Sequence, residues 1–326
     1  TSDQPNVISV TNGTAKVVGQ LGDTQVNLTA TIKRGASVVT KKFKVTVPSI
    51  TIEIPTVITG NIDLPTEIGG NQVTWKTSDA ATITTAGVVT RPATGVKTVT
   101  LTATIGGREI PTVVTVLPST KSMKLEEDFT GKTVTTGNCT WQSASLSGGL
   151  SIQNDAAHGD HFVLTQDGSS GNRGAFGTFV NLGTLNATYC IEMDICLRSG
   201  NVANRSMSQF VIAGSNCDGK YNNNNGATTG YVLKLATPAL ATDGNTTTWY
   251  INDTNESIKL SADTWVHVTA IASTDTGVVS VKIASDKETL YNGSVNMKNP
   301  GTLSGIYIQS GRGNGVSKVD NIQIYE

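Results

Sequence analysis

Short runs of alternating apolar and polar residues, each bounded by glycine, asparagine or proline, extend along almost the whole chain. Such runs are typical of β-strands with one buried and one exposed face, and no stretch shows a sustained helical repeat. Charged residues make up only 15% of the 326 residues, against roughly 25% in an average globular protein. Threonine and valine, which favour strands, are abundant. The sequence therefore predicts an all-β protein.

The charge balance and the length of the apolar runs exclude two classes of partner. The chain has 24 Lys and Arg against 25 Asp and Glu, a net charge of −1, and no run of basic residues. It lacks the basic patch that nucleic-acid binding requires. No apolar run approaches the roughly 18 residues of a membrane-spanning helix. We expect neither nucleic acid nor a membrane span.

The first third of the chain contains an internal repeat. The sequence Leu-Thr-Ala-Thr-Ile occurs at 28–32 and again at 101–105, and each copy ends in an alternating strand followed by Pro-Ser. Repeats of this kind indicate one structural unit used twice. Because each segment alternates, the sequence predicts two small β-sandwiches in tandem.

The two copies are unequal. Residues 49–76 precede the matching part of the second copy, and no residues correspond to them in the first. Half a sandwich exposes a sheet edge and one face of its core. We therefore expect residues 1–48 to be the C-terminal half of a domain that an upstream segment completes, and residues 49–120 to be a complete domain.

Three segments of this region resemble a known family. They are Trp75–Asp79, Ala86–Thr90 and the repeated Leu-Thr-Ala-Thr-Ile strand, and they are similar to the short, atrophied immunoglobulin-like domains of bacteria. In that family the domains are spacers beside catalytic domains of secreted carbohydrate-active enzymes. The resemblance implies a scaffold role and carries no catalytic residue over to this chain.

Residues 121–326 have a different pattern. Many short strands with Gly, Asn and Asp turns favour two packed antiparallel sheets, a jelly-roll (concanavalin-like) sandwich. The opening Glu-Glu-Asp-Phe, the Thr264–Val268 strand and the closing Val319–Ile324 strand resemble carbohydrate-binding modules and laminin-G-like domains. The expected strands are 124–129, 161–166, 175–180, 189–197, 208–213, 231–235, 247–251, 265–272, 278–284, 305–309 and 318–325.

Acids in the first and last of these strands indicate a metal site. Glu127 is in register with Leu125, and Asp320 with Ile322, so we expect both acids to point inward, where an unpaired charge is costly. Two inward carboxylates plus loop carbonyls suit calcium, which the resembling modules often carry. The predicted ligands are Glu127, Asp128 and Asp320, with carbonyls of residues 158–160. The alternative is that one acid pairs with Lys or Arg, or caps a turn.

One strand resembles part of a catalytic signature. Glu192 and Asp194 resemble the start of the Glu-x-Asp-x-x-Glu motif of retaining glucanases, in which two glutamates flank the scissile bond. The third acid is absent here, because Cys196 and Leu197 occupy its possible places, so the proton donor is missing. We expect a polar sheet face and no catalytic site.

Sugar recognition combines aromatic rings with polar side chains that bind hydroxyl groups. Trp249 and Tyr250 are neighbours in a strand, so at most one of them is in the core. The resembling domains bury the ring equivalent to Trp265, so we expect Trp265 in the core. Other candidates lie in polar loops or at strand ends. The predicted sugar contacts are Trp249, Tyr250, Tyr221, Tyr231, Arg173, Asn224 and Arg312.

The histidines and cysteines give weaker signals. His158 and His161 lie three apart with no third ligand nearby in sequence, and His267 lies in a regular strand, so we expect structural roles for all three. The cysteines are Cys139, Cys190, Cys196 and Cys217. Cys190 and Cys196 would be about 20 Å apart along one strand, too far to bond each other. Buried free thiols, or one bridge to Cys139 or Cys217, remain the alternatives.

These observations favour a non-catalytic, polysaccharide-binding and spacer region of a secreted bacterial carbohydrate-active protein. We expect an extracellular or cell-surface location, with a polysaccharide or oligosaccharide as partner. One alternative is a surface adhesin or structural stalk. A jelly-roll polysaccharide lyase or glycoside hydrolase is another, and it would require a cleft with paired acids.

Overall fold

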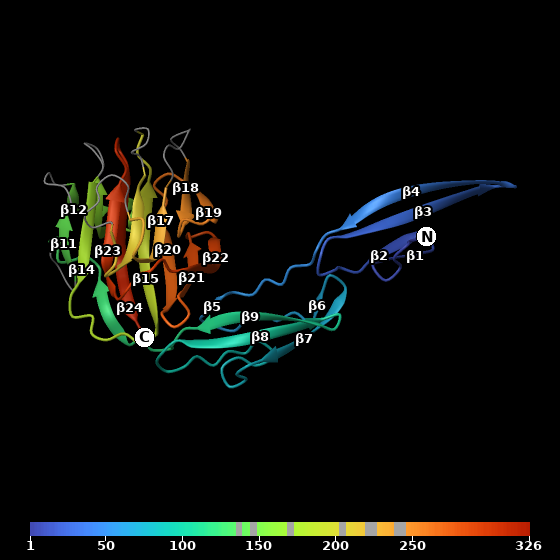
Figure 1. Cartoon of the computed structure of the whole chain (residues 1–326), viewed down its shortest axis with the longest axis horizontal. Coiled ribbons are helices and arrows are strands. Elements are labelled where there is room, and N and C mark those ends of the chain that lie inside the picture. The colour runs from blue at the N-terminus through green and yellow to red at the C-terminus, as the bar shows by residue number, and fades with distance from the viewer. Residues whose placement is uncertain (135–138, 144–148, 168–172, 202–206, 219–226, 238–245) are drawn as a thin grey trace. The chain divides into compact units, whose positions relative to one another are not determined.

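The computed structural model describes residues 1–134, 139–143, 149–167, 173–201, 207–218, 227–237 and 246–326, and nearly every element in them is a strand (Figure 1). The chain divides into two compact units, residues 1–91 with 98–116 and residues 92–97 with 117–326. Within the described residues, the helical structure is one 3-10 turn, η1 (Ala156–His158), and no helix is long and apolar enough to span a bilayer. The predicted all-β class is confirmed.

The first unit consists of two hairpins and one sheet. β1 (Ile8–Thr11) pairs with β2 (Thr14–Val17), and β3 (Thr24–Arg34) pairs with β4 (Ser37–Val47). The five-stranded sheet has the order β5-β9-β8-β7-β6, with β5 parallel to β9. Its strands are β5 (Val57–Ile58), β6 (Glu67–Ile68), β7 (Asn71–Thr77), β8 (Lys97–Ile105) and β9 (Arg108–Val116).

The repeated strands lie in different surroundings. In β8 the apolar positions of Leu-Thr-Ala-Thr-Ile are buried in a core that includes Val73 and Trp75 of β7. In β3 the equivalent of Ile105 is Ile32, and its side chain is 65% exposed, whereas that of Ile105 is 2% exposed. The difference follows from the segment beside each copy. β7 pairs with β8 from Leu101 to Ile105, whereas residues 1–3 pair with β3 near Leu28 and do not extend to Ile32.

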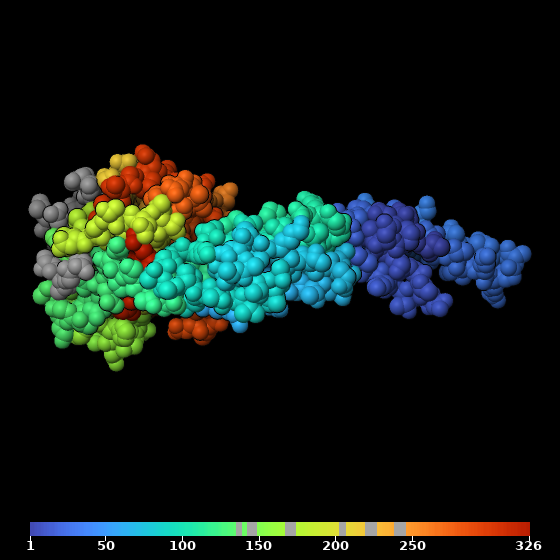
Figure 2. All heavy atoms as spheres, turned by 90° about the horizontal axis from the view of Figure 1, so that it is seen from below, coloured from blue at the N-terminus to red at the C-terminus, as the bar shows by residue number. Residues whose placement is uncertain are grey.

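The β3–β4 hairpin has an apolar outer part. Its tip extends past β1 and β2 in both views (Figures 1 and 2). Val38, Val39 and Phe43 are 55%, 63% and 45% exposed, and a small core near the other end contains Val26 and Val47. The hairpin is therefore held at its base, while its distal apolar side chains are exposed to solvent.

The second unit is a sandwich of two large sheets. One has the order β12-β13-β24-β15-β20-β21-β22, with β10 also paired to β24, and the other has the order β11-β14-β23-β16-β17-β18-β19. The strands of the first are β10 (Met123–Glu127), β12 (Leu150–Asp155), β13 (His161–Asp167), β15 (Thr188–Arg198), β20 (Val266–Ser273), β21 (Val278–Ala284), β22 (Thr289–Asn296) and β24 (Val316–Tyr325). Those of the second are β11 (Cys139–Ser143), β14 (Arg173–Phe179), β16 (Gln209–Gly214), β17 (Tyr231–Ala236), β18 (Thr246–Ile251), β19 (Ser257–Ser261) and β23 (Leu303–Ser310).

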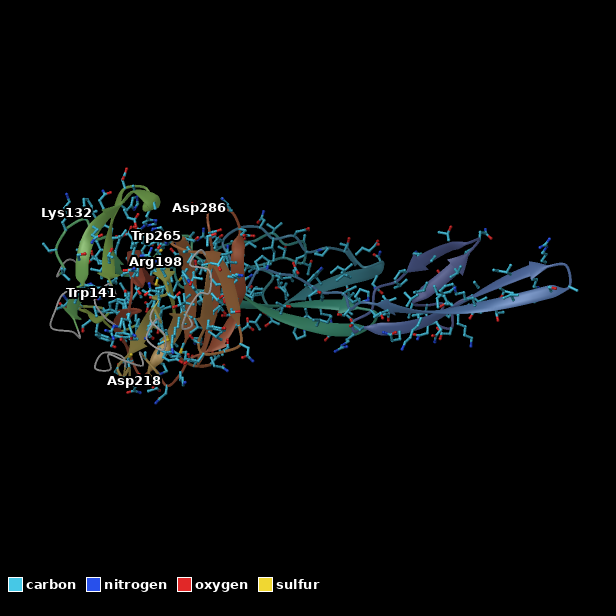
Figure 3. All side chains as sticks on the ribbon, turned by 90° about the horizontal axis from the view of Figure 1, so that it is seen from above. Lys132, Trp141, Arg198, Asp218, Trp265 and Asp286 are labelled. Atoms are coloured by element: carbon cyan, nitrogen blue, oxygen red, sulfur yellow. The ribbon has the colours of Figure 1, made fainter. Side chains whose placement is uncertain are left out.

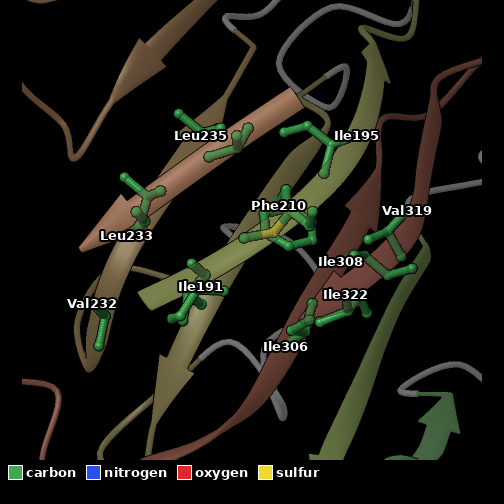
Figure 4. Close-up of a cluster of buried hydrophobic side chains, with 14 of the residues drawn as sticks. Ile191, Ile195, Phe210, Val232, Leu233, Leu235, Ile306, Ile308, Val319 and Ile322 are labelled. Carbon is green, nitrogen blue, oxygen red and sulfur yellow. The ribbon is translucent and has the colours of Figure 1, made fainter. Parts of the chain in front are cut away.

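The core lies between these sheets. Ile191 and Ile195 of β15 belong to the same buried cluster as Phe210 of β16 and Ile308 of β23 (Figure 4). Each buried side chain of this size stabilises the fold by about 1.5–3 kcal/mol relative to exposure. The predicted concanavalin-like sandwich is confirmed, and sequence patterning missed its strands β11, β12, β19 and β22.

All four cysteines are buried, and none of them forms a disulfide. Burial raises the pKa of Cys190 to about 12 and that of Cys196 to about 12, so both are protonated thiols at neutral pH. Of the two alternatives left open by the sequence, the structure has free thiols.

The repeat provides a matched stability test. Ile105→Ala is expected to destabilise the first unit by about 2–5 kcal/mol, because it leaves a cavity in a closed core. Ile32→Ala, at the equivalent exposed position, is expected to cost about 0.5 kcal/mol or less. Urea unfolding of the full chain, followed by pulsed hydrogen exchange at residues 97–116 and 24–47, measures both. Equal losses would contradict the difference in burial.

Candidate functional site

The outer face of the eight-stranded sheet carries a row of ionisable groups. Along β15 the apolar side chains face the core, so Glu192 and Asp194 point outward. Glu192 accepts a hydrogen bond from the Tyr325 hydroxyl at 2.6 Å and forms an ion pair with Lys121. Both carboxylates of the Glu-x-Asp segment thus belong to a polar sheet face, as expected.

A β-bulge in β24 places Asp320 on this same outer face. Glu192 pairs with Gln323, but Asp194 pairs with Asp320, so β24 contains one extra residue between these positions. Asn321 adopts a left-handed conformation (φ 49°) there, as a bulge residue often does. Val319 and Ile322 both face the core as a result, and Asp320 faces outward.

All three histidines of the chain lie close to these two aspartates. His267 Nδ1 is 2.8 Å from Asp194 Oδ1. His158 Nε2 lies 3.2 Å from Asp320 Oδ2 and 3.4 Å from Asp194 Oδ2. His161 Nδ1 lies 3.3 Å from Asp320 Oδ2. We call these five residues the His/Asp cluster.

The connection between β12 and β13 positions His158 and His161. Asp155 caps η1 by accepting a hydrogen bond from the Ala157 backbone N–H at 2.9 Å. Its carboxylate also binds Lys318 of β24 at 2.6 Å and the indole of Trp265. Gly159, with φ 67°, then reverses the chain so that His161 begins β13. Asp155 therefore holds this turn against β24.

Hydrogen bonds and burial set the protonation of the cluster. Burial would raise the pKa of Asp194, but hydrogen bonds from His267 and Asn321 outweigh it and lower that pKa. The hydrogen bond to Asp194 raises the pKa of His267. Asp320 is completely buried, and burial raises its pKa despite a backbone hydrogen bond from Asn321 and the charges of His158 and His161.

The predicted calcium ligands do not come together. Glu127 is buried on the core side of β10, beside Ile322, and accepts a hydrogen bond from the Phe129 backbone N–H at 2.9 Å. Asp320 points to the opposite face because of the bulge, so the expectation that both acids point inward is wrong. Asp128 is exposed and binds the backbone and hydroxyl of Thr130.

Two predicted sugar contacts are wrong because the rings are in the interior. Trp249 and Tyr231 have no exposed surface. Trp249 belongs to the main core, and Tyr231 packs with Tyr307 on the other side of the seven-stranded sheet. The Tyr231 hydroxyl donates to Asp253 Oδ2 at 2.5 Å. Burial of both rings leaves neither face for a sugar.

Two other predicted sugar contacts are exposed and stay predictions. Tyr250 is 38% exposed, and Arg312 is also exposed. Tyr221 and Asn224 lie outside the described residues, as does the side chain of Arg173. Neither Tyr250 nor Arg312 lines any of the three pockets described below.

A pocket next to the His/Asp cluster combines an aromatic ring with hydroxyl and charged side chains. Its volume is about 480 Å³, and it is formed where the β19–β20 connection and the β21–β22 turn meet. Trp265 and Asp286 both line it, and both residues are labelled in Figure 3. Trp265 precedes β20 and is partly exposed, so its expected place in the core is wrong. Further lining residues are Lys259, Ser261, Asp263, Thr264, Ser285, Lys287 and Glu288.

The pocket and the His/Asp cluster are in contact through His158 and Trp265. The rings of His158 and Trp265 stack with centroids 4.0 Å apart and planes at 16°. Ala157, the residue before His158, lines the pocket itself. Asp263, also in the lining, is held by Arg198 at 2.8 Å. Two further pockets, of about 670 and 250 Å³, contain no aromatic residue in their linings.

Comparison with known proteins assigns part of the chain. Residues 52–116 match the family model of the atrophied bacterial Ig domain. This match lies within the second copy of the repeat and confirms the resemblance for that segment. No curated protein matches the chain.

Several solved structures are similar to part of the chain at low identity. The glycoside hydrolase family 131 catalytic domain from Coprinopsis cinerea is 12% identical, with a TM-score of 0.43, covering 63% of this chain and 94% of that chain. Lectin II from Ulex europaeus is 8% identical, with a TM-score of 0.38, covering 58% and 92%. A Bauhinia forficata lectin in complex with GalNAc is 9% identical, with a TM-score of 0.39, covering 63% and 98%. These scores carry no statement about ligand or activity.

Sequence reasoning missed both parts of this site. The sequence feature that could have indicated the cluster is the His-x-x-His spacing at 158–161, in a chain with only three histidines. The pairing of Asp194 with Asp320 depends on strand order, and strand order has no local signature. The predicted strand 265–272 includes Trp265, whereas β20 begins at Val266, so Trp265 precedes the strand.

The His267–Asp194 pair predicts a pH-dependent contribution to stability. Because the folded-state pKa of His267 is raised, its contribution is complete below the unfolded value of about 6.5 and is lost as pH rises through the folded value. His267→Gln is therefore expected to lower the melting temperature at pH about 5.5 and hardly at pH about 9. Calorimetry with chelator present measures this, and an equal loss at both pH values would contradict it.

Proposed function

We propose that residues 121–326 form a non-catalytic glycan-binding module and that residues 1–120 serve as a spacer, as parts of a secreted carbohydrate-active protein. The observation that carries the proposal is the pocket containing Trp265. Sugar sites combine an aromatic ring with hydroxyl and charged groups that fix orientation. This pocket combines the indole with the hydroxyls of Ser261, Thr264 and Ser285.

The charges around the pocket suit a neutral glycan. The lining contains three acids and two lysines, namely Asp263, Asp286, Glu288, Lys259 and Lys287. Arg198 neutralises Asp263. A site with balanced charge supplies hydrogen bonds to hydroxyl groups without selecting a strongly charged ligand, and we infer a neutral polysaccharide or oligosaccharide as the partner.

The two acids of the Glu-x-Asp segment, Glu192 and Asp194, are held by other side chains outside the pocket. Glu192 and Asp194 are engaged by Lys121, Tyr325, His267 and Asn321 and do not line the pocket. Weak binding of a few sugar units becomes effective when a module is attached to a catalytic or cell-surface partner, which raises the local concentration. The similarity of residues 52–116 to the atrophied bacterial Ig domain supports the spacer role.

Affinity electrophoresis of the full chain against a panel of neutral polysaccharides tests the proposal. Wild-type protein should be retarded by at least one of them. Trp265→Ala should weaken retention by about tenfold or more, as loss of an aromatic anchor does in other interfaces. Asp286→Ala, at an exposed position, should weaken retention without lowering the melting temperature.

Tyr250→Ala is the matched control, because Tyr250 is an exposed aromatic residue outside the pocket. It should leave retention unchanged. Loss of retention in Tyr250→Ala alone would move the site to the other sheet. Absence of retention on every polysaccharide would favour an adhesin or stalk, and release of reducing or unsaturated sugar ends would contradict the non-catalytic assignment.

A further inference from the structure

The His/Asp cluster holds two carboxylates in an unfavourable arrangement. Asp194 and Asp320 are directly opposite each other on neighbouring antiparallel strands, where like charges are destabilising. Asp320 is also fully buried. A cation at this position would remove the repulsion.

Two atoms in the cluster have no hydrogen-bond partner among the described residues. They are the buried His158 Nε2 and Asp320 Oδ1. Buried polar atoms are nearly always satisfied, and an exception calls for an explanation such as a bound ion. His158 Nε2 lies 3.2 Å from Asp320 Oδ2, the second oxygen of the same carboxylate. The two unpartnered atoms are therefore close together.

The spacing of the nitrogen and oxygen atoms fits metal coordination better than hydrogen bonding. Asp320 Oδ2 lies 3.2 Å from His158 Nε2 and 3.3 Å from His161 Nδ1. Charge-assisted N–H···O bonds are shorter, about 2.7–2.9 Å. Ligand atoms about 2.0–2.1 Å from a tetrahedral zinc ion lie about 3.3 Å from one another. All three ligand atoms are within 4.8 Å of each other.

The donor set selects the class of ion. Two imidazole nitrogens and one carboxylate oxygen suit zinc and related first-row transition metals, whereas calcium and magnesium prefer oxygen ligands only. Asp194, 3.4 Å from His158 Nε2 and fixed by His267 and Asn321, lies beside the ligands where it can orient them. Three protein ligands leave a coordination position for water or another group.

We propose that His158, His161 and Asp320 bind one divalent transition-metal ion of the zinc class on the outer face of the eight-stranded sheet. The site is preorganised, because Asp155 anchors the β12–β13 turn to Lys318 and the bulge at Asn321 turns Asp320 outward. It requires no rearrangement of the sandwich. The assignment does not depend on glycan binding.

Isothermal titration of the full, untagged chain with ZnCl₂, after treatment with chelator, tests this site. Wild-type protein should bind one equivalent of zinc and melt at a higher temperature with zinc than without it. His161→Gln, at an exposed position, should weaken binding by about tenfold or more and abolish this thermal shift. Asp320→Asn, which preserves shape, should do the same.

His267→Gln is the matched control, because it removes an imidazole from the same cluster without removing a ligand. It should retain one equivalent of zinc and the thermal shift, with an affinity lowered less than in His161→Gln, because it only releases Asp194 beside the ligands. The cobalt derivative of wild-type protein should show visible absorption bands that His161→Gln lacks. The proposal would be overturned if wild-type protein bound no stoichiometric zinc. Unchanged zinc binding in both His161→Gln and Asp320→Asn, or displacement of zinc by equimolar calcium, would also overturn it.

Discussion

The second unit depends on the burial of one face of each large sheet against the other. This constraint assigns every second residue of β15, β20 and β24 to the core, including Ile191, Val268 and Val319. The intervening residues must then face outward, and they include the ionisable Glu192, Asp194 and His267. The polar row on the outer face is therefore a consequence of the same alternation that builds the core.

The bulge at Asn321 changes this alternation at one place. Without the extra residue, Asp320 would share a face with Ile322 and would bring a charge into the interior, at a cost that a sandwich of this size could hardly offset. With it, Asp320 joins Asp194 outside. One residue in a left-handed conformation thus decides whether the acid disturbs the core or belongs to a polar site.

The sequence predicted the fold well and the site poorly, for a physical reason. Strands such as Val278–Ala284 are specified by their own alternation, and this one was predicted with its observed bounds. The His/Asp cluster depends on which strands become neighbours, on the bulge in β24 and on the turn that Asp155 holds. None of these features has a periodic signature, and Trp265 fell outside its expected strand by one residue.

His158 connects the two parts of the candidate site. Its ring stacks on Trp265, while its Nε2 atom faces Asp194 and Asp320. Asp155 binds both the Trp265 indole and the backbone of the turn that carries His158. An ion on His158 would fix the imidazole and, through the stack, the indole that lines the pocket. By thermodynamic linkage, a ligand that orders Trp265 would strengthen metal binding by the same factor. The two sites therefore share one structural element, the stacked rings of His158 and Trp265.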